Sequence, residues 1–216
     1  MSGTTRLALT VTLLVYPSLR AAEFEFYLTG NGQDWWRFWG VTMLGHWLCF
    51  GVVAWSLRAD QERWSSLGVD WGWFRRHRGL LLLGAGLLVG AVVAVSLLVE
   101  SPARTGLFPL QATSLPERLF MLLGAVVTAG VVEEVVFRGF ALTRLGQLLG
   151  SPWWALPLSM VSFLLLHGTP SDPARTASIL VFGLLFGAVF ILLRRRRLEY
   201  LILLHGLLNL PLLFLR

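Results

Sequence analysis

Apolar runs of membrane length recur along the chain and limit the folds that are open to it. The run from Gly79 to Val99 contains no charged residue, and about 20 such residues are what an α-helix needs to cross a bilayer core. Only 14% of the 216 residues are charged and 56% are hydrophobic, whereas a soluble domain carries about 25% charged residues. The sequence therefore predicts an all-α, polytopic transmembrane helix bundle with little chain left for a soluble domain.

Charges, prolines and interfacial tryptophans divide the chain into about seven to eight expected helices. Seven are placed, over residues 7–19, 35–57, 79–99, 117–149, 153–167, 174–193 and 198–215. We expect one integral membrane domain over residues 1–216. Residues 1–116 would supply its N-terminal helices, and residues 117–216 the helices that carry the polar motifs around an intramembrane cavity.

Every basic residue is an arginine, and the formal net charge is +6. The arginines gather in the connection from Arg58 to Arg78, the turn at 138–151 and the block Arg194–Arg197. With seven spans and the N-terminus inside, all three segments fall in the cytoplasm, as the positive-inside rule requires. Anionic headgroups account for the basic charge, so we expect a lipid bilayer and no nucleic acid as partner. The predicted location is a cell membrane crossed several times, in a prokaryote the cytoplasmic membrane.

Two adjacent carboxylates and a guanidinium interrupt the apolar run between Leu119 and Leu149. These are Glu133, Glu134 and Arg138, and each charge costs about 2.5–3.5 kcal/mol to insert at the centre of a membrane helix. Glu134 and Arg138 are four residues apart and therefore placed to pair. The cluster is either a structural ion-pair network or a functional site.

Two histidines and an asparagine are expected at the depth of Glu133. The Gly150-Ser151-Pro152 turn predicts a helical hairpin in which Glu133 and His167, each 17 residues from Gly150, stand level. His205 lies eight residues beyond Arg197, with Asn209 one turn further on the same helical face. Interhelical hydrogen bonding is the structural alternative for His205 and Asn209, and an interfacial position at a helix end is the alternative for His167. A further histidine, His46, is interpreted as a packing residue.

This residue set suits hydrolysis of an amide. Glu133 in a dry pocket can act as general base on a water that His167 orients, while His205 and Asn209 donate hydrogen bonds to the developing oxyanion. Nucleophile pairings of the Ser-His or Cys-His type, GxSxG and HExxH are absent from the sequence. The one cysteine, Cys49, lies in an apolar segment and allows neither an internal disulfide nor a cysteine-based metal site.

Three motifs resemble those of the CAAX-protease and bacteriocin-processing family, also called CPBP or Abi. They are Glu133-Glu134-x-x-x-Arg138, Phe163-x-x-x-His167 and His205-x-x-x-Asn209. This family of intramembrane endopeptidases includes the type II prenyl-protein peptidases, and the resemblance covers about Glu117 to the C-terminus. It implies a bundle of about eight helices with the site in a cavity open to the cytoplasm. It also implies Glu133 as base with His167 as its partner, an oxyanion site at His205 and Asn209, and Glu134 and Arg138 as supporting groups.

The expected activity is that of a glutamate-type intramembrane endopeptidase that cleaves a membrane-associated protein or peptide near its anchor. The alternative is a non-catalytic bacteriocin-immunity or regulatory membrane protein. We expect no cofactor and no metal; the alternative is a zinc ion held by Glu133, His167 and His205, a usual catalytic ligand set.

Overall fold

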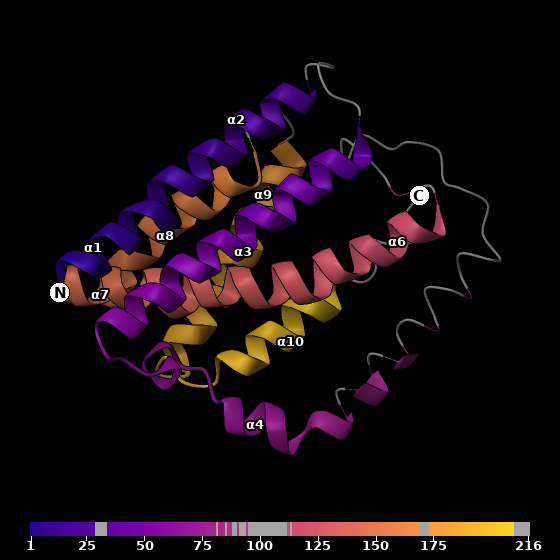
Figure 1. Ribbon diagram of the computed structural model, residues 1–216. Helices are drawn as coiled ribbons and strands as arrows, with labels where there is room; N and C mark the ends of the chain where they lie inside the picture. The colour runs from indigo at the N-terminus through magenta and orange to yellow at the C-terminus, as the bar shows by residue number, and fades with distance from the viewer. Residues whose placement is uncertain are drawn as a thin grey trace.

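A bundle of long helices makes up the part of the chain that the computed structural model describes, which is residues 1–28, 34–80, 82–84, 86–87, 90, 94, 112, 114–168 and 173–209. Figure 1 shows the helices running roughly along one common direction. These residues include no β-strand. The predicted all-α helical bundle is confirmed.

The first two helices form an antiparallel pair. The first is continuous through α1 (Gly3–Thr10), η1 (Val11–Val15) and α2 (Tyr16–Leu28), and the second is α3 (Trp35–Ala59). The predicted end of the first helix at residue 19 is wrong, because Arg20 does not leave the helix. It is buried there and pairs with Glu23 one turn later.

The helix predicted for residues 117–149 is a single rod of 35 residues. It comprises α6 (Leu115–Leu122), η3 (Leu123–Leu142) and α7 (Thr143–Leu149), and a capping box between Ser114 and Glu117 fixes its start. Backbone hydrogen bonding in η3 is of the π type, which reaches one residue further along the chain than in an α-helix.

The predicted hairpin after this rod is confirmed. The rod stops at Gly150, whose φ of +70° is the left-handed conformation of a helix C-terminal cap. Ser151 then caps α8 (Pro152–Leu166), which packs back against α7 and η3. Two further helices follow, α9 (Pro173–Leu192) and α10 (Leu198–Asn209), and α10 packs along η3.

Two predicted segments are described only in part. Residues 78–80, 82–84, 86–87, 90 and 94 are helical, in agreement with the helix predicted for 79–99. The remainder of that helix, the loop to residue 111, residue 113 and the end of the last predicted helix (210–215) lie outside the described residues.

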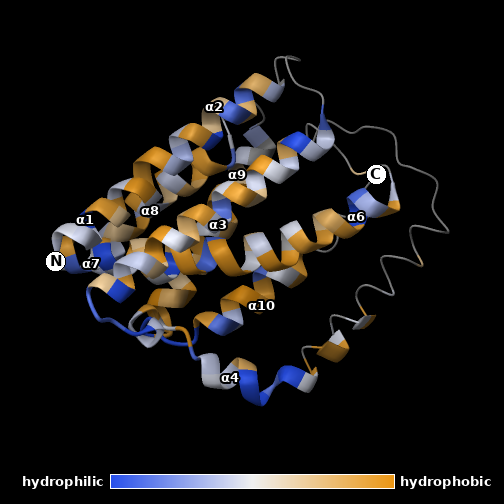
Figure 2. Cartoon of the chain, in the orientation of Figure 1, coloured by the Kyte–Doolittle hydropathy of each residue, from blue (hydrophilic) through white to orange (hydrophobic). Residues whose placement is uncertain are grey.

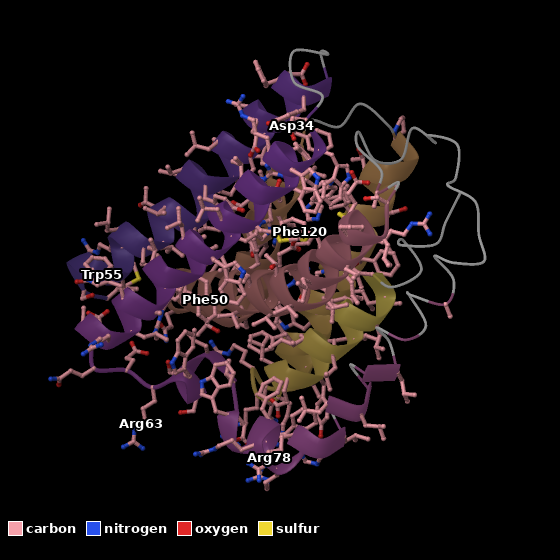
Figure 3. All side chains as sticks on the ribbon, turned by 45° about the vertical axis from the view of Figure 1, so that its right-hand side comes forward. Asp34, Phe50, Trp55, Arg63, Arg78 and Phe120 are labelled. Carbon is pink, nitrogen blue, oxygen red and sulfur yellow. The ribbon has the colours of Figure 1, made fainter. Side chains whose placement is uncertain are left out.

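The three arginine-bearing connections meet at one end of the bundle, which we call the arginine end (residues 1–6, 58–78, 144–151 and 194–199). Here η2 (Trp64–Leu67) and the short helix α4 (Trp71–Arg76) follow α3. Leu198 N–H donates to the Gly68 carbonyl at 2.9 Å, and Arg144 pairs with Glu62. Figure 3 shows the labelled Arg63 and Arg78 far from Asp34, which caps the opposite end of α3.

The helices expose large apolar side chains on the outside of the bundle, including Leu48, Trp154 and Leu192. Figure 2 shows hydrophobic residues along the helices, while hydrophilic residues gather on α4 and the connection beside it. Within the part of the chain that the structure describes, three helices are long and apolar enough to cross a bilayer: Gly3–Tyr27, Trp35–Ala59 and Leu115–Leu149. The chain is a membrane protein.

Substituting the two left-handed glycines at the arginine end should destabilise the bundle to different degrees. A Cβ on Gly68 (φ +83°) would lie 2.7 Å from the Arg195 carbonyl oxygen, whereas one on Gly150 would meet nothing within 4 Å. We expect Gly150→Ala to cost about 1–2 kcal/mol for the left-handed backbone, and Gly68→Ala about 1–3 kcal/mol more for the clash. Unfolding by SDS titration in detergent micelles measures both; equal losses would contradict the packing at Gly68.

Candidate active site

The predicted site residues share one cavity of about 520 Å³. Glu133, His167, His205 and Asn209 all line it, contributed by η3, the end of α8 and α10. The N-terminal helices complete its wall with His46 and mostly apolar side chains. The cavity therefore joins three motifs that lie far apart in sequence. Glu133 and His167 share it as their equal spacing from the Gly150 turn predicted.

One carboxylate oxygen of Glu133 has no direct hydrogen bond to any of the described residues. This oxygen, Oε2, is buried and lies 3.9 Å from His167 Nε2 and 4.0 Å from His205 Nε2. These distances are too long for a direct hydrogen bond. They are short enough for one water molecule to bridge the carboxylate and an imidazole.

Each of the two predicted histidines has its ring orientation fixed by its other nitrogen. His167 Nδ1 lies 2.8 Å from the Phe163 carbonyl, and since a carbonyl only accepts, Nδ1 carries the hydrogen. In the neutral ring, His167 Nε2 is then an acceptor. His205 Nδ1 lies 2.7 Å from Glu134 Oε1 and donates to it. Both rings therefore turn Nε2 toward Glu133.

The predicted pair between Glu134 and Arg138 is present. Arg138 Nη1 lies 3.1 Å from Glu134 Oε1, and both side chains are almost completely buried. The guanidinium also stacks over the Phe163 ring, with its central carbon 4.2 Å from the ring centroid. Arg138 thus holds Glu134, and Glu134 in turn holds His205.

His46 belongs to the same polar network, which the sequence interpretation missed. Its Nε2 lies 3.2 Å from Glu133 Oε1, and its Nδ1 lies 2.7 Å from the Tyr16 hydroxyl and 2.8 Å from the Thr42 carbonyl. The expectation of a mere packing residue is corrected, because this buried ring contacts the proposed base directly. An ionisable residue within an apolar membrane helix was itself a signal of a site.

The donor atoms around Glu133 are spread more widely than one zinc ion requires. Ligands bound to a tetrahedral zinc at about 2.0–2.2 Å lie roughly 3.3–3.6 Å from one another, compared with 3.9 and 4.0 Å from Glu133 Oε2 to the two histidines. Within the described ranges, no group of three His, Cys, Asp or Glu side chains is arranged to hold a metal ion.

Comparison with known families agrees with the three motifs. Residues 115–211 match the family described as type II CAAX prenyl endopeptidase Rce1-like. We refer to this segment as the Rce1-like domain. It begins at the first residue of α6 and includes Glu133, His167, His205 and Asn209. The match supports assignment of this segment to the CAAX-protease family of membrane peptidases.

Neither the curated proteins nor the solved structures include a match to the chain. His46 and Tyr16 lie outside the Rce1-like domain, on helices that precede it. The cavity is therefore built jointly by the Rce1-like domain and by the N-terminal helices.

Removing one member of the Glu134–Arg138 ion pair should destabilise the fold more than removing both. We expect Arg138→Met to lower the free energy of unfolding by about 3–5 kcal/mol, because it leaves a buried carboxylate without its partner. The double variant Glu134→Gln with Arg138→Met should recover part of that loss, since both charges are gone. A double-mutant cycle by SDS titration measures this, and a double variant less stable than Arg138→Met would contradict it.

Proposed function

We propose that the protein is a glutamate-type intramembrane endopeptidase that passes through the cell membrane several times. The observation that carries the proposal is the position of Glu133 Oε2, which is buried and has no hydrogen-bond partner among the described residues. It faces two histidine nitrogens at water-bridging distance. A carboxylate held in this way can take a proton from a bound water. The Rce1-like domain supports peptide-bond hydrolysis as the reaction.

In the proposed first step, water attacks the carbonyl carbon of the scissile peptide bond. Glu133 accepts one proton of the water, while the neutral His167 accepts a hydrogen bond from the other through Nε2. The new carbon–oxygen bond pushes the carbonyl electrons onto oxygen and forms a tetrahedral oxyanion. No step requires a metal ion, since the proton moves to a residue of the chain.

His205 and Asn209 would stabilise that oxyanion. The Asn209 amide is a hydrogen-bond donor in any protonation state, and His205 donates from Nε2 when both ring nitrogens carry a hydrogen. The Glu134 carboxylate fixes the His205 ring through Nδ1. Collapse of the intermediate breaks the C–N bond, and the proton held by Glu133 passes to the leaving amine, which regenerates the carboxylate.

The wall of the cavity suits a substrate segment that is itself apolar. Aromatic and aliphatic side chains line it beside the polar group, among them Phe24, Phe38, Trp39, Met43 and Phe182. An extended peptide next to a membrane anchor would bury its side chains there. The proposed substrate is therefore a membrane-associated protein or peptide that is cut near its anchor.

Exchanging Glu133 for glutamine should remove activity without removing the fold. We expect Glu133→Gln to lower kcat by about 10²–10⁴-fold, the usual contribution of a general base. The assay is cleavage of membrane-anchored quenched fluorescent peptides by purified protein in liposomes. The matched control is Glu199→Gln, because Glu199 is also fully buried but belongs to the arginine end and does not line the cavity.

The same assay with a strong chelator tests the zinc alternative. Wild-type activity that survives the chelator agrees with the proposal, and activity lost to the chelator and restored by zinc contradicts it. If Glu133→Gln and wild type do not differ on any peptide cut by the wild type, the glutamate mechanism is wrong. A folded wild type that cuts none of the peptides but binds a partner protein would favour the immunity or regulatory alternative.

His46 should act as a positioning residue for Glu133. A hydrogen bond to a charged group is worth about 1.5–3 kcal/mol, so His46→Ala should lower kcat by roughly 10- to 150-fold. KM should change little, because the ring contacts Glu133 on the side away from Oε2. Tyr16→Phe removes only the outer hydroxyl and should have a smaller effect in the same direction. A rise in KM with unchanged kcat would assign His46 to substrate binding instead.

A further inference from the structure

One charged side chain that lines the cavity, Arg20, has no task in the proposed mechanism. It belongs to α2, lies outside the Rce1-like domain and is 5% exposed. An arginine keeps its charge in proteins, and a charged residue within an apolar membrane helix is a candidate functional residue. Arg20 is therefore examined as a group that contacts the substrate.

Only part of the Arg20 guanidinium is occupied. Its Nη1 pairs with Glu23 one turn later, and its central carbon lies 5.5 Å from the centroid of the Phe38 ring. Its Nε is buried and has no hydrogen-bond partner among the described residues. A guanidinium carries five N–H donors, and a buried donor without an acceptor is costly. A ligand that brings an acceptor to this group would remove that cost.

A carboxylate is the part of a peptide that fits the guanidinium best. Its two oxygens accept parallel hydrogen bonds from neighbouring N–H groups of an arginine. The wall beside Arg20 is aromatic, since the Phe38 ring contacts both Arg20 and the Phe24 ring, and both phenylalanines line the cavity. Opposite charges attract more strongly in such surroundings than in water.

The register of α3 gives the separation between Arg20 and Glu133. Arg20 contacts Phe38 on this helix, and Glu133 contacts His46. Phe38 and His46 are eight residues apart, which is about 12 Å along a helix. An extended peptide advances about 3.3 Å per residue. A carboxylate bound at Arg20 would therefore lie about three or four residues from a bond placed at Glu133.

We propose that Arg20 binds a carboxylate of the substrate and thereby selects peptides that carry one about three or four residues from the cleaved bond. This inference rests on the proposed function, because it takes the cavity to be the site of cleavage. An acidic side chain and a free C-terminus offer the same chemistry and are both sources of the carboxylate. Arg20 precedes the matched residues 115–211, so this selection belongs to the N-terminal helices.

A purely structural pair between Arg20 and Glu23 is the alternative, and two variants separate it from the proposal. Arg20→Gln removes the cation, and Glu23→Gln removes the anion that shares it. In a structural pair both variants affect acidic and neutral substrates alike. In a carboxylate site they act in opposite directions on acidic substrates, because Glu23 repels the incoming carboxylate and Arg20 attracts it.

The experiment measures kcat and KM in liposomes of zwitterionic lipid, with peptides that the wild type cuts. The cut bond is mapped by mass spectrometry, and glutamate or glutamine is placed at each nearby position. A second series compares a free C-terminus with its amide at the same distances. These two series distinguish an acidic side chain from a chain terminus as the source of the carboxylate.

We expect the wild-type KM to be about 10- to 100-fold lower for the acidic peptide at the third or fourth residue, the ratio that a charge-assisted hydrogen bond supports. Arg20→Gln should remove this preference and change the KM of neutral peptides little. Arg20→Lys should restore part of it, and Glu23→Gln should increase it. A wild type without the preference, or a preference that survives Arg20→Gln, would overturn the proposal.

Arg144→Gln is the comparison variant, because Arg144 is also buried and paired with a glutamate but does not line the cavity. It should keep the acidic preference. Gel filtration in detergent checks that each variant is folded. If Arg20→Gln does not fold, the double variant with Glu23→Gln takes its place, since it leaves neither charge unpaired. An acidic preference in the folded double variant would equally overturn the proposal.

A binding measurement separates failure of this proposal from failure of the peptidase. The Glu133→Gln variant in nanodiscs is titrated with N-palmitoylated peptides of leucine and alanine that end in a carboxylate or a carboxamide, or carry one glutamate before a carboxamide. Tighter binding of an acidic peptide, lost when Arg20→Gln is added, retains the carboxylate site even if no peptide is cut. Cleavage without any acidic preference retains the peptidase and overturns the role of Arg20.

Discussion

A buried charge in an apolar helix bundle is stable only when it is paired with another polar group. In this structure the central buried charges lie on one long helix, Leu115–Leu149. Glu133, Glu134 and Arg138 leave η3 within about one turn and a half, and each is matched from another helix or from the same one. An unpaired charge in such surroundings costs several kcal/mol. Helices α3, α8 and α10 pack around η3 and supply the histidines and the aromatic ring that these charges need. The packing of the helices around η3 therefore also determines which residues make up the site.

Sequence reasoning recovers much of this arrangement because the signals are strong and local. Gly150, Ser151 and Pro152 define a hairpin, and equal distances along its two arms bring Glu133 and His167 to the same depth. The four-residue spacing of Glu134 and Arg138 predicts their ion pair in the same way. The helix-forming runs are equally plain, since long apolar stretches bounded by arginine and tryptophan have few other interpretations.

The N-terminal contribution is what sequence reasoning missed. A charge at Arg20 indicates a helix end unless it is known to be paired with Glu23 one turn later. His46 carries no motif, and its contact with Glu133 spans 87 positions, a separation that no local pattern encodes.

The contact between His46 and Glu133 joins two parts of the chain that a family comparison treats separately. The three motifs all lie within residues 115–211. Glu133 Oε1, however, is hydrogen-bonded to the His46 ring, which lies outside this range. Two chains with the same three motifs can therefore hold that carboxylate differently, depending on what their preceding helices place beside it. In this chain the proposed base lies in the matched segment, and one of its hydrogen-bond partners lies in the helices before it.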